Sequence, residues 1–597
     1  MLNPLKHLTA RPAGRPAASG PARPAAPRSR RTRRAGGAIA VLAAMALVAS
    51  CGTTTATSGG SSGSGATIST AVRQASVGAS AADVLAANAD TSEAVAAITD
   101  ADGAGTYDAS AATTITASGG SVEVSGTGTG NVTTDSADGT TVTITGSGTY
   151  VLTGTLDDGR VVVSAEDADV RLVLAGASIT NADGPAIDVQ DAGSAVMVLA
   201  EGTTNRLADG SSYADTGEDA ATAALYSSDT LAITGTGSLA VTGSYKDGIS
   251  SKNGLVIAGG PTITVNAADD GVRGKDYLLV SSGRLTVTAG GDGLKSSEDD
   301  DETRGFVALG AATVTVASGD DGISATTDVT VDGTTLSITA GGGQASATVS
   351  GQEPGQGGPE RGAPDQDQSA DSTEADSTPS PKGINAGVAY AQDSGSVTID
   401  AADEGLQGAF VNVNGGSLDI ASGDDGVNAS NGDSTIEGYE NADSESDDGS
   451  ALTISGGQVQ IDYASSDGID SNGSAHVTGG EVVVGGAAGT MDGSVDANGE
   501  TTLVGVSASL AVAEGDTITV TSADGTSWTL TSRVSADAVT VLGLSEGAEY
   551  TVSTTSGGST TATASALSAG MDGGPGGPGG PEGPGGPGDQ DGPGPRG

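Results

Sequence analysis

The sequence predicts an all-β protein built as a parallel β-helix, a stack of short repeated coils. The first observation is an Asp-Gly or Glu-Gly step followed by an aliphatic residue. Its glycine stands at positions 248, 271, 293, 322, 405, 426 and 468, so the commonest interval is 21 to 23 residues. The second is that short runs of Leu, Val, Ile and Thr follow the early steps, with the alternation typical of strands.

Composition supports the same fold class. The chain of 597 residues contains 98 glycines and only 2% aromatic residues, so its core is expected to consist of small and β-branched side chains. Helix-rich globular folds are therefore disfavoured. The formal net charge of -51 repels nucleic acid, and it attracts divalent cations where carboxylates converge.

The first fifty residues differ from the rest, with nine Lys/Arg and no acid. An arginine cluster at 28–34 precedes an apolar run at 38–48, and small residues lead to Cys51, the single cysteine. This stretch resembles a bacterial lipoprotein signal peptide. The resemblance implies cleavage before Cys51, acylation of its sulfur and attachment to the outer face of the cell membrane. A plain secretory signal with an incidental cysteine is the alternative.

Residues 51–109 are predicted to form a flexible stalk, because 52–65 are rich in Gly, Ser and Thr. The Ala-rich segment 71–99 is compatible with either a short helix or more stalk. The β-helix is expected from residue 110 to 499, with about ten coils of three strands each. For one coil, the inward residues would be Ile249, then Leu255 and Ile257, then Ile263 and Val265.

Two insertions interrupt the coils. Residues 342–381 have a Gly/Pro/Gln-rich and Ser/Asp-rich composition that predicts a disordered loop, and 431–450 form an acidic insert. Beyond residue 499 the period is lost, and 500–566 are expected to form a small β module. The Gly/Pro-rich segment 567–597 is predicted to be a disordered tail.

The repeated acids carry the main chemical prediction. In stacked coils they would form columns about 5 Å apart, and each adjacent pair would repel by about 3 kcal/mol at an effective dielectric of 20. Turn chemistry alone can explain any single Asp-Gly, but the repulsion within a column must be relieved by shifted pKa values, by nearby lysines or by bound cations. Oxygen ligands favour Ca²⁺. The predicted metal-binding residues are Asp247, Asp269, Asp270, Asp292, Asp320, Asp321, Asp403, Glu404, Asp424, Asp425 and Asp467.

Several phrases of the sequence occur in an order that resembles a bacterial surface family. They include 145–156, 170–176, 205–209, 223–227 and 235–248. The chain is similar here to carbohydrate-binding proteins of clostridial type. The resemblance implies a calcium-containing, right-handed parallel β-helix like that of pectate lyases. It also implies binding of cellulose-like or acidic polysaccharides without established catalysis.

The function expected from this sequence is polysaccharide binding at the cell surface by a monomer with no nucleic-acid partner. Arg273, Lys275, Tyr277 and Lys295 are the candidate carbohydrate-binding residues. The first alternative is a calcium-dependent polysaccharide lyase, in which a basic residue takes a proton beside a bound cation. The second is a structural surface scaffold or adhesin.

Overall fold

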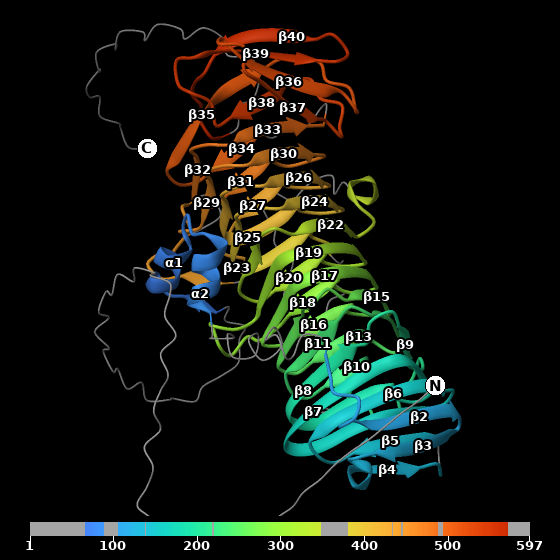
Figure 1. The fold of residues 1–597 in the computed structure, drawn as a ribbon. Helices are drawn as coiled ribbons and strands as arrows, with labels where there is room; N and C mark the ends of the chain where they lie inside the picture. The colour runs from blue at the N-terminus through green and yellow to red at the C-terminus, as the bar shows by residue number, and fades with distance from the viewer. Residues whose placement is uncertain are drawn as a thin grey trace, which may run out of the picture. The chain divides into compact units, whose positions relative to one another are not determined.

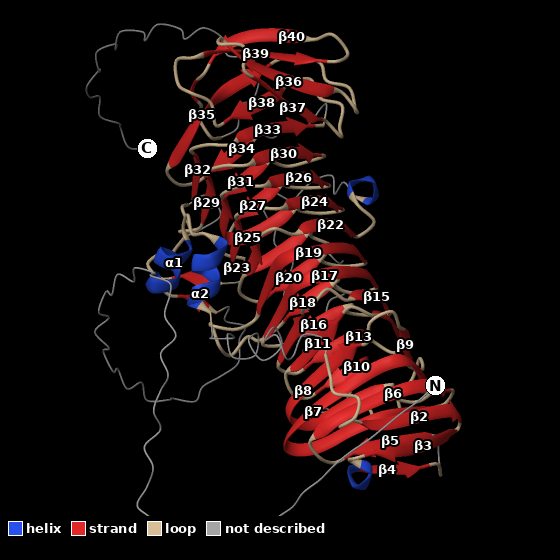
Figure 2. Cartoon of the chain, in the orientation of Figure 1, coloured by secondary structure: helices blue, strands red, loops and turns tan. Residues whose placement is uncertain are grey.

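In this computed structural model the described residues are 66–88 and 106–570, apart from 138, 218–219, 348–379, 433, 443–445 and 488–492. The predicted signal peptide, Cys51, most of the first insertion and the tail beyond 570 lie outside them. The chain divides after Ser62 into two compact units, and all described residues belong to the second. The all-β class is confirmed, because strands dominate the described residues, and two short α-helices and two single 3-10 turns accompany them (Figure 2).

Parallel pairings connect strands of neighbouring repeats, and they fall into three series within one large sheet (Figure 1). The first series includes the strands that begin at or directly after the Asp-Gly and Glu-Gly steps, and the strands that stack on them. It contains β8 (Ile187–Leu199), β10 (Ala223–Ser227), β13 (Asp247–Ser251), β16 (Val272–Gly274), β18 (Leu294–Ser296), β20 (Ile323–Ala325), β23 (Ile384–Gln392), β25 (Leu406–Val413), β27 (Val427–Ala429), β31 (Ile469–Ser471) and β34 (Val495–Ala497).

The second and third series share some of their long strands with each other or with the first. The second runs through β8, β11 (Leu231–Gly235), β14 (Gly254–Ile257), β17 (Tyr277–Ala289), β19 (Phe306–Ser318), β21 (Val329–Val331), β23, β25, β29 (Ala451–Ile454), β32 (Ser474–Val477) and β35 (Thr501–Ala508). The third runs through β9 (Thr204–Ala208), β12 (Ser238–Gly243), β15 (Thr262–Ala267), β17, β19, β22 (Thr335–Ala340), β24 (Ser396–Ala401), β26 (Ser417–Ser422), β30 (Gln458–Tyr463) and β33 (Glu481–Gly486).

The core consists of aliphatic residues that recur in register along these series. Ile249, Val272 and Leu294 pair in succession and are fully buried. The corresponding positions of the other two series are filled by Leu, Val and Ile as well. Because successive side chains of a strand point to opposite faces, the residues between these aliphatics lie on the outside.

The first repeats contain antiparallel hairpins as well as parallel pairs. β2 (Thr113–Gly119) pairs with β3 (Ser121–Gly126), and β4 (Val132–Asp135) pairs with β5 (Thr140–Ile144), both antiparallel. β6 (Gly148–Leu156) and β7 (Gly159–Thr180) then pair in parallel with the strands before and after them.

Residues 66–88, within the segment predicted as stalk, contain a short strand and two helices, and a short helix is one of the two alternatives for the Ala-rich part. β1 (Thr67–Ile68) pairs with β28 (Thr435–Ile436) of the acidic insert. Helix α2 (Ala81–Ala87) packs on β21 and β23, and helix α1 (Thr70–Ser76) packs on α2. Figure 1 shows the two helices on the flank of the sheet. Among the described residues, no helix is long and apolar enough to cross a membrane.

The helices form because their ends are capped and their inner faces are apolar. Ser69 and Ser80 accept hydrogen bonds from the first turns of α1 and α2, which satisfies otherwise unpaired N–H groups. Ala81 and Val84 are buried against Ala389 and Phe410. Ala-rich composition alone does not distinguish such a docked hairpin from stalk.

The insertion that begins after β22 leaves the stacking register undisturbed. Ile323 of β20 pairs with Ile384 of β23, the first strand after the insertion. The two ends of the insertion are also close together, since a Cβ atom on Gly341 would lie 2.6 Å from Cγ of Pro381.

The C-terminal region is a β module, but the stack continues further into it than the sequence indicated. β35 pairs in parallel with β32, and both β33 and β35 pair antiparallel with β38 (Val539–Leu542). A separate antiparallel sheet contains β36 (Thr517–Ser522), β37 (Ser527–Thr531), β39 (Glu549–Thr554) and β40 (Ser559–Thr563). β41 (Ser565–Ala566) returns to β35.

Candidate functional site

The Asp-Gly step is fixed by close packing between repeats. A Cβ atom on Gly293 would lie 2.2 Å from Cγ1 of Val316 and 2.6 Å from the carbonyl oxygen of Gly322. The same clash with an inward Val or Ile occurs at the other repeated glycines. None of them has positive φ, so the turn-chemistry alternative does not explain why glycine stands at these positions. Glycine is required because the next repeat occupies the space of a side chain.

The acids of these steps form a hydrogen-bonded ladder. The backbone N–H of Asp292 donates to Oδ1 of Asp270 at 3.1 Å, and that of Asp321 donates to Oδ1 of Asp292 at 3.0 Å. The N–H of Lys382 donates to Oδ1 of Asp321 at 2.9 Å, and that of Asp467 to Oδ1 of Asp425 at 2.9 Å. Each carboxylate therefore satisfies a backbone donor in the following repeat.

Two lysines neutralise part of the ladder. Nζ of Lys295 lies 3.2 Å from Oδ2 of Asp270 and 2.8 Å from Oδ2 of Asp292. Nζ of Lys382 lies 2.6 Å from Oε2 of Glu404 and 3.4 Å from Oδ2 of Asp403. The lysine partners that the sequence offered as one form of charge relief are therefore present at these two places.

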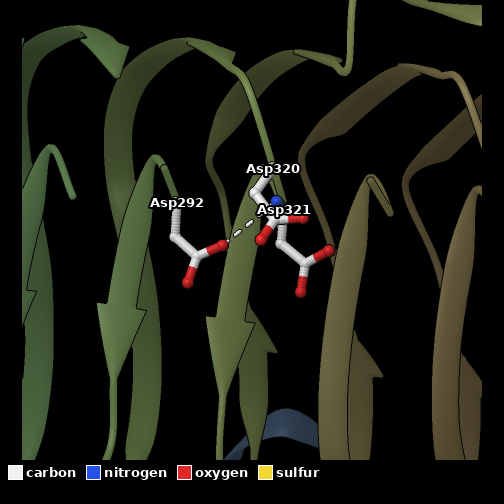
Figure 3. Close-up of side chains that lie close together, drawn as sticks. All are labelled: Asp292, Asp320 and Asp321. Carbon is white, nitrogen blue, oxygen red and sulfur yellow. Dashed lines mark hydrogen bonds between the residues drawn. The ribbon is translucent and has the colours of Figure 1, made fainter. Parts of the chain in front are cut away.

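Three acids converge where no lysine meets all of them. Oxygen atoms of Asp292, Asp320 and Asp321 lie within 4.8 Å of one another, and Figure 3 shows these side chains on adjacent turns. Burial, followed by the charge of Asp292, raises the pKa of Asp321 to about 7. Three crowded carboxylates, of which burial raises the pKa of Asp292 and Asp321, fit the donor set of a hard cation such as Ca²⁺.

The other predicted metal-binding acids lie on the same line of turns but do not converge in this way. Burial and the charge of Asp270 raise the pKa of Asp247 to about 6, and burial raises that of Asp425 to about 8.

The remaining predicted acids are exposed or bonded within the chain. Asp269 is exposed. Asp424 accepts hydrogen bonds from Ser465 and Ser466, and Asp467 accepts one from the N–H of Gly493. Among the described residues, the second group of three close acids is Glu298, Asp299 and Asp300.

The four predicted carbohydrate-binding residues are not equivalent. Arg273 donates to Oγ of Ser297 at 2.8 Å, and Nζ of Lys275 lies 2.8 Å from Oε2 of Glu298. Tyr277 is 8% exposed and stacks on Phe306 with ring centroids 5.7 Å apart. Its ring belongs to the packing between β14, β17 and β19 and presents little surface to a sugar.

Arg273 and Lys295 belong to a continuous row of outward-facing residues on the first series, which we call the polar file. Its members pair in register from one repeat to the next, directly beside the acid ladder. They are Asp188, Tyr226, Ser250, Arg273, Lys295, Ser324, Asn385, Gln407, Asn428, Asp470 and Asp496.

Two concave regions lie on the polar file. A cavity of about 670 Å³ includes Asp188, Tyr226 and Arg160 in its lining. A second of about 470 Å³ includes Ser324, Asn385 and Gln407. Amides, hydroxyls and charged groups at a spacing of about 4.8 Å can hydrogen-bond successive hydroxyl groups of an extended ligand.

Sequence reasoning missed most of the polar file. Asn385, Gln407 and Asn428 occupy the second position after the glycine of their steps, so the period itself could have identified them. Asp188 lies in an early repeat that has no Asp-Gly step. The positive charges of Arg273 and Lys295 led to the prediction of two residues of the polar file. Uncharged amides in the same file do not stand out in the sequence in this way.

The fold and the site define an all-β protein with a long polar face and a row of buried acids. Residues 138–426 match the model of a family described as "Carbohydrate-binding domain-containing protein". A protein of that description from Acetivibrio thermocellus is 35% identical over 116 residues, which are 19% of this chain and 40% of the relative. The match thus spans about two fifths of that relative's length.

One solved structure is also similar. It is described as the polysaccharide lyase-like protein from C. thermocellum, in a gadolinium derivative. It is 29% identical with a TM-score of 0.37, and the match covers 38% of this chain and 92% of that one.

Proposed function

We propose that this protein binds polysaccharide at the cell surface, with an extended glycan lying along the polar file. The single observation that carries the proposal is the unbroken row of hydrogen-bonding side chains on the first series. The match of residues 138–426 to a carbohydrate-binding family model supports it. The chain's own fold is proposed to be a right-handed parallel β-helix with three strands per coil, which the three series of parallel pairs support.

The acid ladder is proposed to bind Ca²⁺ at Asp292, Asp320 and Asp321. The cation would neutralise carboxylates that burial leaves without enough positive partners, and it would offer a binding position for anionic oxygens of a glycan. Attachment to the outer face of the cell membrane is proposed from the sequence around Cys51 alone.

Binding without catalysis is preferred over a lyase. A base that removes a proton from a uronate must be neutral at the start of the reaction. Lys295 is held between Asp270 and Asp292, and these charges outweigh burial and raise the pKa of the lysine. Lys295 therefore stays protonated and suits binding of an oxyanion better than proton abstraction.

The test is calorimetric titration of the full chain with soluble neutral and acidic glycans, in Ca²⁺ and in EDTA. The double variant Asn385→Ala/Gln407→Ala removes two side chains of the polar file, and we expect affinity to fall about 30-fold, since each of the two lost hydrogen bonds contributes about 1 kcal/mol. Ser337→Ala on the exposed side of β22 is the matched control.

Three results would decide against the proposal. No binding to any glycan would leave the scaffold alternative. Equal binding by the double variant and the control would place the glycan elsewhere. Release of unsaturated uronides from an acidic glycan during the titration would identify a lyase.

A further inference from the structure

Hydrogen bonds and ring stacking fix the turns that form the wall of the cavity at the start of the polar file. Asn181 Nδ2 donates to the carbonyl of Pro185 at 2.9 Å, which fixes one turn, and the N–H of Ala214 donates to the carbonyl of Asp183 at 2.8 Å. The hydroxyl of Tyr213 donates to Oδ2 of Asp209 at 2.8 Å. The ring of Tyr213 also stacks on Tyr245 with centroids 4.3 Å apart. The cavity therefore has a defined shape.

The lining of the cavity includes two buried polar side chains of the polar file, Asp188 and Tyr226. Asp188 is 5% exposed and accepts a hydrogen bond from Nε2 of Gln190 at 2.7 Å. The hydroxyl of Tyr226 is buried, and it lies beside the side chains of Lys252 and Ser228. A phenol can both donate and accept, so the hydroxyl of a ligand in the cavity can form a further hydrogen bond with Tyr226.

The charges around the cavity favour neutral sugars over acidic ones. Asp183, Asp188 and Asp215 line it, against the single lining cation Arg160, and Lys252 lies near Tyr226 from outside the lining. A uronate would bring a further carboxylate close to these acids and be repelled. Hydroxyl groups of a neutral sugar can instead donate to Asp188 and accept from Tyr226. A volume of about 670 Å³ is within the range of pockets that enclose small organic ligands.

We infer that this cavity is a separate binding site for a neutral sugar segment, and that it excludes uronic acids. The inference rests on the proposed function and deepens it. The cavity takes neutral units, whereas the polar file near Arg273 and Lys295 has positive groups that accommodate acidic ones. The polar file would then bind neutral units of a glycan at one position along its length and acidic units at another.

The experiment titrates the full chain with neutral hexasaccharides of glucose and of xylose, a hexauronate and a glucosamine hexamer, all in Ca²⁺. We expect Asp188→Ala to weaken binding of at least one neutral ligand by tenfold or more, and Tyr226→Phe to weaken it by about threefold. Tyr226→Phe should leave hexauronate affinity unchanged, and Asp188→Ala, which removes one of the repelling charges, should not lower it. Thr264→Ala, on the exposed side of β15, is the matched control.

A second pair of variants tests the exclusion and does not depend on loss of binding. Asp183→Asn/Asp215→Asn should raise affinity for the hexauronate at least threefold and leave neutral binding within twofold. Neutral binding that is unaffected by Asp188→Ala and Tyr226→Phe, yet lost in Asn385→Ala/Gln407→Ala, would overturn this inference and keep the proposed function. Preferential binding of the glucosamine hexamer would overturn it in favour of a cationic ligand. Absence of binding to every oligosaccharide would refute both.

Discussion

At the scale of single residues, glycine is required at the repeated steps because neighbouring repeats lie too close together for a larger side chain. Gly248, Gly271 and Gly293 each lie where a Cβ atom would meet an inward Val at 2.2 Å. These positions tolerate no side chain although their backbone angles are accessible to any residue. The glycine recurs in the sequence because each repeat packs closely against the next at this position.

Gly293→Ala is expected to lower the free energy of unfolding by about 1–3 kcal/mol, because the new methyl group collides with Val316 and the backbone of Gly322. Thermal unfolding followed by circular dichroism measures the effect. Gly120→Ala is the control, since nothing lies within 4 Å of its Cβ position, and it should change stability by less than about 0.5 kcal/mol. Equal effects of the two substitutions would contradict the packing explanation.

The acids of the same turns have two roles at once. Asp321 satisfies the N–H of Lys382 and accepts from Nδ2 of Asn385 at 3.1 Å, yet its pKa of about 7 indicates that its charge is poorly compensated. A neutral isostere keeps the hydrogen bond of the backbone and removes the charge.

Asp321→Asn is expected to abolish most of the rise in Tm that Ca²⁺ produces. In EDTA at pH 8 the variant should be as stable as the parent or more so, because it no longer buries an ionised carboxylate. Differential scanning calorimetry with and without Ca²⁺ separates the two effects. Asp299→Asn, in the other group of close acids, should retain the Ca²⁺ response if the proposed site is correct.

At the scale of elements, the helical hairpin is attached through a buried acid. Asp328, which precedes β21, accepts from Nδ2 of Asn88 at 2.8 Å and from the N–H of Ala389 at 3.0 Å. Arg73 on α1 donates to the carbonyl of Gly449 at 2.7 Å and lies over the ring of Tyr439. The hairpin thus makes polar contacts with several repeats.

Burial raises the pKa of Asp328 from 3.8 to about 6. The folded state then binds more protons than the unfolded state between these values, so this residue's contribution to stability falls as the pH rises through them. Relative to the parent, Asp328→Asn should gain about 2 kcal/mol of unfolding free energy between pH 4.5 and pH 7. Chemical denaturation at both pH values measures this. The exposed Asp332→Asn is the control, and a parallel response of the two variants would contradict the assignment to Asp328.

The elements also show what the sequence could and could not predict. The period identified the first-series strands and their inward residues, because Ile249, Val272 and Leu294 recur at nearly constant spacing. It missed the docking of α1 and α2, since partners such as Phe410 are far away in sequence. The cavity beside Asp188 was missed because the early repeats lack the Asp-Gly step, and its wall comes from turns between the strands.

At the scale of the whole described body, the C-terminal module covers the last repeat of the stack. β38 pairs with both β33 and β35. Arg533 extends across several repeats, with Nη2 2.9 Å from Oδ2 of Asp419 and Nη1 donating to the carbonyl of Ile399 at 3.2 Å. Terminal caps of this kind keep repeat proteins soluble by covering open strand edges.

Truncation after residue 508 is expected to convert a monodisperse protein into oligomers or aggregates, because it leaves β33 and β35 without β38. Size-exclusion chromatography with light scattering measures the state. A chain that ends at residue 570 keeps every described strand and should behave like the full chain. A monomeric product of the shorter truncation would show that the module is not needed as a cap.

The insertion after β22 has a practical consequence. Its two ends meet beside Gly341 and Pro381, and the pairing of Ile323 with Ile384 continues across it. A foreign segment grafted at this point would begin and finish at one spot on the surface, so it would add little closure entropy to folding. The position between β22 and β23 is therefore an insertion point at which enzymes, epitopes or fluorescent reporters can be displayed without altering the pairing of the stacked strands.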